Sequence, residues 1–172
     1  MMVAALSFTA CGSDDDDNGG SGGGNTNKTI TIDGESYYCG ELCTVEQTKG
    51  NGMYLQVTAV EDKMFQYKGH ELMVHISPSK VAELKVGQTF DSNNISVRTF
   101  RTLTEMSTSG RWDVVSGSIR ITAIRKSEIT IQINKLIVKH NPREVEHTID
   151  GTATLTNSLH YENGDVVPFD EE

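Results

Sequence analysis

Apolar and polar residues alternate along most of the chain from residue 29 onward, which is typical of β-strands with one buried face. The segments 117–123 and 129–134 both place small or apolar residues at every second position, and a short polar stretch at 125–128 separates them. This pattern predicts a hairpin.

The alternation changes phase after the second of these segments. Leu136 and Val138 have the opposite parity from Ile129, Ile131 and Ile133. A slip of one residue would turn a whole apolar set toward solvent, so the shift predicts a β-bulge near Asn134 or Lys135.

The remaining strands are expected between turn signals rich in Gly, Asn and Asp. They are Thr29 to Asp33, Tyr37 to Glu46, Met53 to Val60, Glu71 to Ile76, Ile95 to Leu103 and a threonine-rich strand over 148–156. The inward sets include Met53, Leu55, Val57 and Ala59, and later Leu72, Val74 and Ile76. The one expected helix is a single turn over Pro78 to Leu84, which Ser77 would cap.

Eight or nine short strands in residues 28–172 predict a single all-β domain. We expect an antiparallel β-sandwich, because the connection over 78–90 is long for a simple up-and-down meander. A lipocalin-like β-barrel is the alternative, since both architectures produce the same alternation.

Composition narrows the classes of function. The 172 residues include 15 Lys and Arg against 24 Asp and Glu, a formal net charge of -9, which argues against nucleic acid as a partner. No apolar run reaches the ~20 residues of a membrane-spanning helix. There is no nucleophile elbow and no glycine-rich phosphate loop, so we expect a protein that is not an enzyme and needs no cofactor.

The N-terminal residues differ in composition from the β domain. Residues 1–10 form an apolar stretch that ends in small residues directly before Cys11. Residues 12–27 hold four adjacent aspartates and then only small or polar residues, which predicts an acidic, glycine-rich, disordered tether. No Lys or Arg precedes Cys11, so we expect the start of the signal to lie upstream.

The stretch Leu6-Ser7-Phe8-Thr9-Ala10-Cys11 resembles a bacterial lipobox, and Ser13 followed by Asp14, Asp15, Asp16 and Asp17 resembles the export signal of Bacteroidetes surface lipoproteins. The resemblance implies cleavage before Cys11, acylation of that cysteine with diacylglycerol and palmitate, and display on the outside of the outer membrane. It covers about the first two dozen residues; Phe8 stands where Leu is commonest, and the basic n-region is missing.

Cys39 and Cys43 leave two alternatives open. A turn at Gly40 would let them form a disulfide, which export from the cytoplasm permits. In a straight strand they would lie ~13 Å apart, beyond disulfide reach, and would be two buried thiols. The spacing is a weak metal signal, and we expect no metal site.

Candidate ligand-binding residues are the aromatic ones. Trp112 stands at a loop-to-strand junction, and Tyr37, Tyr38, Tyr54 and Tyr67 are the tyrosine candidates, with Phe65 and Tyr161 beside them. Rings that cap the core are the alternative interpretation of the same residues. We interpret the five histidines, His70, His75, His140, His147 and His160, as solvated surface residues, because no two of them have metal-ligand spacing.

These features predict a non-catalytic binding module for glycan or peptide, anchored by lipid at the cell surface. One alternative is a structural accessory lipoprotein that contacts other envelope proteins. The other is a lipocalin-like carrier, which requires an apolar cavity.

Overall fold

The computed structural model describes residues 29–48, 52–64, 67–77, 84–105, 110–125, 128–162 and 165–166. Every helix or strand element in these ranges is a strand, which confirms the all-β prediction. The strands are β1 (Ile30–Ile32), β2 (Glu35–Cys39), β3 (Thr44–Thr48), β4 (Gly52–Val60), β5 (Gly69–Ile76), β6 (Thr89–Asp91), β7 (Ile95–Thr102), β8 (Arg111–Arg125), β9 (Glu128–Asn141), β10 (Val145–Glu162) and β11 (Asp165–Val166). The leader, the tether and residues 78–83 of the predicted helical turn lie outside the described residues.

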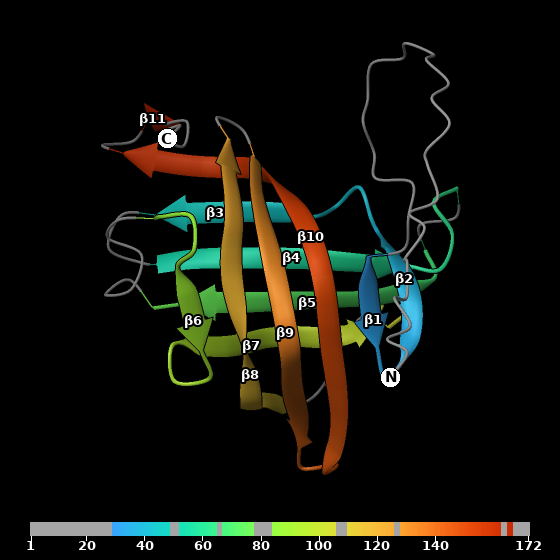
Figure 1. Cartoon of the computed structure of the whole chain (residues 1–172). Helices are drawn as coiled ribbons and strands as arrows, with labels where there is room; N and C mark the ends of the chain where they lie inside the picture. Colours follow the sequence, from blue (N-terminus) through green and yellow to red (C-terminus); the bar gives the residue numbers. More distant parts are fainter. Residues whose placement is uncertain are drawn as a thin grey trace, which may run out of the picture.

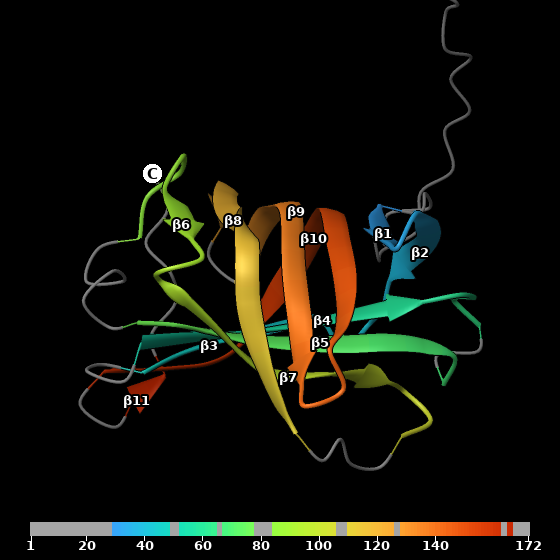
Figure 2. The ribbon, with the colours of Figure 1, turned by 90° about the horizontal axis from the view of Figure 1, so that it is seen from below.

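The strands form one continuous hydrogen-bonded sheet that closes on itself. Five strands, β10, β1, β2, β4 and β3, make the closed ring. β5 and β7 continue the sheet beyond β4, and β9, β8 and β6 continue it beyond β10. Figure 1 shows β8, β9 and the first part of β10 crossing β4, β5 and β7 at a steep angle, whereas the end of β10 runs beside β3. Figure 2 shows the crossing from below.

One pairing departs from the predicted antiparallel pattern. β3 runs parallel to β10, with Thr44 opposite Thr156, whereas the other strand pairs are antiparallel. The reason lies in residues 40–43, where the predicted strand Tyr37 to Glu46 is interrupted. β2 pairs with the end of β4, and the chain then turns so that β3 fills the space between β4 and β10.

The core lies between the crossing layers and is mainly aliphatic. The predicted inward residues Met53, Leu55, Leu72, Val74 and Ile76 are all buried there. They meet the isoleucines of the later strands, namely Ile119, Ile121, Ile129, Ile131, Ile133 and Ile149. Alternation on both sides of this interface therefore buries one face of each strand.

The predicted bulge is confirmed. In the β9–β10 pair, Asn134 and Lys135 together oppose Asp150, because Ile133 pairs with Gly151 and Leu136 with Ile149. Lys135 has a φ of 42°, and its backbone N–H donates to the Asp150 carboxylate at 3.1 Å. The extra residue keeps both apolar sets of β9 on the buried face.

The neighbouring strand β8 accommodates the same bulge with a glycine. Gly117 has a φ of 98°, and a Cβ there would lie 2.3 Å from the carbonyl oxygen of Lys135. Only glycine combines this conformation with so close an approach.

Candidate functional site

The main candidate site is a pocket at the edge of the core, which we call the imidazole pocket. Its volume is about 220 Å³. β5, β7, β8, β9 and β10 and the loops beside them supply its lining, and Figure 1 shows the β9–β10 hairpin extending past β7 on this side. The lining residues are His70, Phe100, Arg101, Thr102, Glu105, Trp112, His140, Arg143, Val145 and His147.

Aromatic and imidazole rings pack around Trp112 at the back of this pocket. Its indole meets Phe100 edge-on, with ring centroids 5.2 Å apart, and meets His140 at 4.7 Å. His147 packs against Phe100 at 4.9 Å. Trp112 is only 9% exposed, so it is not the open platform considered from the sequence; it lines the pocket while belonging to the core.

Three of the histidines correct the surface interpretation. His140 is 3% exposed, and His70 and His147 are partly buried beside it in the same lining. Strands that are far apart in the sequence bring these imidazoles together, which no local spacing could reveal.

The sequence nevertheless contains a signal for the inward position of these histidines. Each is in phase with the inward residues of its own strand: His70 with Leu72, His140 with Val138, and His147 with Ile149. His75 is out of phase with the inward set of β5 and lies on the other face, where it packs against Tyr54 at 4.6 Å. Strand phase therefore separates the pocket histidines from this outer one.

An acid–imidazole pair stands at one side of the pocket. The Nδ1 atom of His147 lies 2.6 Å from Asp33 Oδ2, and the backbone N–H of Thr148 donates to Asp33 Oδ1 at 2.8 Å. Burial, the largest single cause, would raise the pKa of Asp33, but the two hydrogen bonds together with the charges of His147 and His70 outweigh it and lower the pKa. The carboxylate is thus held ionised and fixes the orientation of the His147 ring.

His70 lies deeper and is held differently. Its ring stacks on Phe100 at 5.5 Å and meets the ring of Tyr37 edge-on at 5.4 Å. Burial lowers the pKa of His70, as does the charge of His147, against the smaller opposing effects of the surrounding carboxylates, Asp33, Glu61 and Glu105. The imidazole is therefore held neutral near pH 7.

Some polar atoms in this lining are buried without a hydrogen-bond partner among the described residues. They include Nδ1 of His70 and Nε1 of Trp112. Such an atom costs ~1–3 kcal/mol relative to a paired one, and exceptions of this kind are typical of functional sites.

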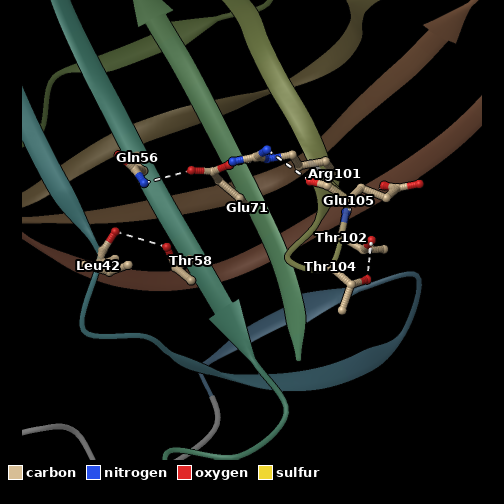
Figure 3. A network of polar contacts seen from close by, with 8 residues as sticks. All are labelled: Leu42, Gln56, Thr58, Glu71, Arg101, Thr102, Thr104 and Glu105. Carbon is tan, nitrogen blue, oxygen red and sulfur yellow. Dashed lines mark hydrogen bonds and ion pairs between the residues drawn. The ribbon is translucent and has the colours of Figure 1, made fainter. Parts of the chain in front are cut away.

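Arg101 enters the lining from a polar network on the other face of the sheet, drawn in Figure 3. Glu71 accepts hydrogen bonds from Gln56 Nε2 at 2.8 Å and from Arg101 Nε at 2.6 Å. Arg101 also donates to the backbone oxygen of Glu105 at 3.0 Å, while the Glu105 carboxylate accepts from the backbone N–H of Thr102 at 3.1 Å. The network fixes both charged groups at the rim of the imidazole pocket.

The predicted tyrosines do not gather in one place. Tyr37 is buried beside His70, whereas Tyr54 lies on the outer face with Arg98 over its ring at 5.9 Å. Lys63 lies over the ring of Tyr38 at 5.4 Å, and Tyr67 is 59% exposed. Phe65 and the side chain of Tyr161 lie outside the described residues, as do Cys11, Ser13 and Asp14 to Asp17.

A second cavity of about 450 Å³ lies on another side of Trp112, between β7 and β8. Its lining is Ser92, Ile95, Ser96, Val97, Arg98, Arg111, Trp112, Asp113 and Val114. Arg111 donates to Asp113 there at 2.7 Å. Trp112 is thus shared by both cavities.

Cys39 and Cys43 are both free thiols, with their sulfur atoms 3.0 Å apart. The straight-strand alternative, with ~13 Å between these positions, is therefore wrong, because the chain turns at residues 40–42. Within the described ranges, no group of three or more His, Cys, Asp or Glu is placed to hold a metal ion. No helix in those ranges is long and apolar enough to cross a membrane.

Comparison with known proteins adds no relative: no family model, no curated protein and no solved structure matches the chain.

Proposed function

We propose that the protein is a non-catalytic binding module whose imidazole pocket receives an acidic side chain of a partner peptide. The observation that carries the proposal is the mixed lining of this pocket. Phe100, Trp112 and Val145 offer an apolar wall, and the polar groups are gathered around it. This combination suits a side chain with an apolar stem and a hydrogen-bonding end.

The charges of the lining favour an acidic end. The charged groups of the lining are the guanidinium groups of Arg101 and Arg143 and the carboxylate of Glu105, while the His147 imidazole is bonded to the Asp33 carboxylate beside the pocket. Glu71 already balances Arg101 through an ion pair of 2.6 Å. Arg143 is then the cationic group of the lining that would meet a carboxylate.

The size of the pocket favours a peptide over a glycan. About 220 Å³ holds one side chain, while an extended sugar chain needs open ring faces to stack on. The Trp112 ring is enclosed by Phe100 and His140 and offers no such face. A carrier of apolar ligands requires an apolar cavity. Here aliphatic side chains fill the space between the layers, and the lining of the imidazole pocket includes polar groups. Both features favour a binding module over a carrier.

The test uses the single tryptophan of the chain as its reporter. Trp112 lies in the pocket wall, so selective excitation of its indole reports on occupancy without a label. We would titrate the full chain with short peptides that differ only in one central residue, either glutamate, lysine or leucine. We expect a saturable change in emission with the glutamate peptide and at least tenfold weaker binding of the other two.

A matched pair of variants separates the pocket from the rest of the surface. Arg143→Ala removes a lining charge and should weaken binding of the glutamate peptide about tenfold, while His75→Ala, on the outer face, should leave it unchanged. Equal binding of all peptides, or equal effects of the two variants, would remove the proposal.

The location that we propose for the module is the outer surface of the outer membrane. It rests on the resemblance of residues 6–11 to a lipobox and of residues 13–17 to a surface-export signal. Acyl chains on one cysteine supply ~0.8 kcal/mol per buried CH₂, and more than one chain is needed for stable anchoring. In this arrangement the tether places the β domain outside the cell, where a partner peptide can reach it.

Two variants test this location in a bacterial host that sorts such lipoproteins. Cys11→Ala should release the protein from the membrane fraction, and unchanged membrane association would refute the anchor. Deletion of residues 14–17 should leave the protein membrane-bound but protected from protease added to whole cells. Cleavage as efficient as in the unmodified protein would refute the export signal.

We propose that the architecture is a β-sandwich in which part of the sheet closes into a ring of five strands. The crossing layers pack face to face around the aliphatic core, which supports the sandwich. The five-stranded ring supports a barrel for that part of the sheet.

A further inference from the structure

The two thiols of residues 39 and 43 lie in a turn that is held tightly against β4. The backbone N–H of Gly40 donates to the carbonyl oxygen of Thr58 at 2.7 Å, and the Thr58 hydroxyl donates to the carbonyl oxygen of Leu42 at 3.0 Å (Figure 3). A Cβ on residue 40 would lie 3.1 Å from Thr58, so a glycine allows this approach. Both ends of the turn are thereby fixed and its two cysteines face each other.

The distance between the sulfurs is already close to that of a bond. They are 3.0 Å apart, and a disulfide of ~2.05 Å needs a movement of about half an ångström by each sulfur. The separation therefore fits a disulfide within the turn better than it fits two unrelated thiols.

The surroundings of the two thiols are unequal. Cys43 is 2% exposed, and its sulfur accepts a hydrogen bond from the backbone N–H of Thr58 at 3.3 Å. Cys39 is only partly buried. The hydrogen bond between the thiols lowers the pKa of Cys39 and raises that of Cys43, which burial raises further. Cys39 is thus the accessible thiol with the more stable thiolate, and Cys43 is the shielded one.

We propose that Cys39 and Cys43 form an intramolecular disulfide by thiol–disulfide exchange, in which Cys39 attacks first and Cys43 resolves the intermediate. The oxidant is a small or protein disulfide. The Cys39 thiolate attacks one of its sulfurs, that S–S bond breaks, and the leaving thiolate takes up a proton. Cys43 then loses its proton and attacks the Cys39 sulfur, which releases the second thiol. The two cysteines are oxidised, and the external disulfide is reduced to two thiols.

This proposal is independent of the imidazole pocket and can be tested on the full chain. Every sample carries Cys11→Ser, so that only residues 39 and 43 react. Treated with oxidised glutathione under native conditions, this chain should lose the mass of two hydrogen atoms and retain no glutathione. The Cys43→Ser variant should retain one glutathione on Cys39. The Cys39→Ser variant should react at least tenfold more slowly.

Two results would overturn the proposal. One is a chain that retains a glutathione on each cysteine, since adjacent thiols would then not resolve each other. The other is equal reactivity of the two single variants. Where a serine variant fails to fold, alkylation of the reduced chain by iodoacetamide shows instead which of the two thiols reacts first. We expect the first label on Cys39, and a first label on Cys43 would contradict the order of attack.

Discussion

The aliphatic core and the imidazole pocket are built by the same strands from different side chains. β9 supplies Ile131 to the core and His140 to the pocket, and β5 supplies Val74 and His70. Core residues such as Ile131 are fully buried among aliphatic neighbours. The pocket instead encloses imidazoles and an indole, and Nε1 of Trp112 has no hydrogen-bond partner in the part of the chain that the structure describes. The difference concentrates stability at one end of these strands and the proposed binding at the other.

Truncation in the core should have the largest effect. Ile131→Ala removes a fully buried side chain between β8 and β10 and leaves a cavity. We expect the free energy of unfolding to fall by about 3 kcal/mol, measured by urea denaturation followed by circular dichroism. The exposed ion-pair variant Arg111→Ala is the control, with a change below ~0.5 kcal/mol.

A substitution of Trp112 in the pocket should lower the free energy of unfolding much less than truncation in the core. Trp112→Phe shortens a ring that borders two cavities and removes the indole N–H that lacks a partner. We expect a loss of about 1 kcal/mol in the free energy of unfolding by the same measurement. A loss as large as that of Ile131→Ala would mean that the pocket is part of the stability core, and the contrast between the two regions would fail.

The smallest expected effect is the dependence of folding stability on pH that His70 contributes. Because the folded state lowers the pKa of His70 below 6.5, the unfolded chain binds this proton more readily. The contribution of His70 to stability is therefore complete above about pH 6.5 and is lost as the pH falls through the lower pKa of the folded state.

Unfolding at pH 8 and pH 5 tests this effect. Replacement by a side chain that does not titrate, in His70→Gln, should make the stability less dependent on pH in this interval. Asp33 does not interfere, since its lowered pKa places its own effect below about pH 3.8. An equal pH dependence of the variant and the unmodified chain would show that His70 is not held neutral.

Much of the fold could be predicted because its signals are local. Alternation located the inward faces of β4, β5, β9 and β10, and the change of phase at Asn134 located the bulge. The described residues form eleven strands where eight or nine were expected, partly because Gly40 to Leu42 interrupt the run from Tyr37 to Glu46. That turn depends on hydrogen bonds to Thr58, a partner that the local sequence does not reveal.

The imidazole pocket could be predicted only in part. The phase of His70, His140 and His147 along their strands indicates an inward position, whereas the missing metal-ligand spacing, on which the surface interpretation rests, carries no information on burial. Their assembly around Trp112 follows from the crossing of the layers, which the alternation does not specify. The approach of Cys39 and Cys43 likewise depends on the turn at residues 40–42, whose geometry the local sequence does not determine.

The parallel seam between β3 and β10 has a consequence for the speed of folding. It joins Thr44 to Thr156, so the ring closes only when residues more than a hundred positions apart have met. Contacts of such long range cost loop entropy before they contribute stability, and domains dominated by them fold in milliseconds to seconds. The β8–β9–β10 meander, whose pairings are local, can form beforehand. Closure of the seam would then be a slow step, during which the edges of β3 and β10 stay open to the wrong partner strand.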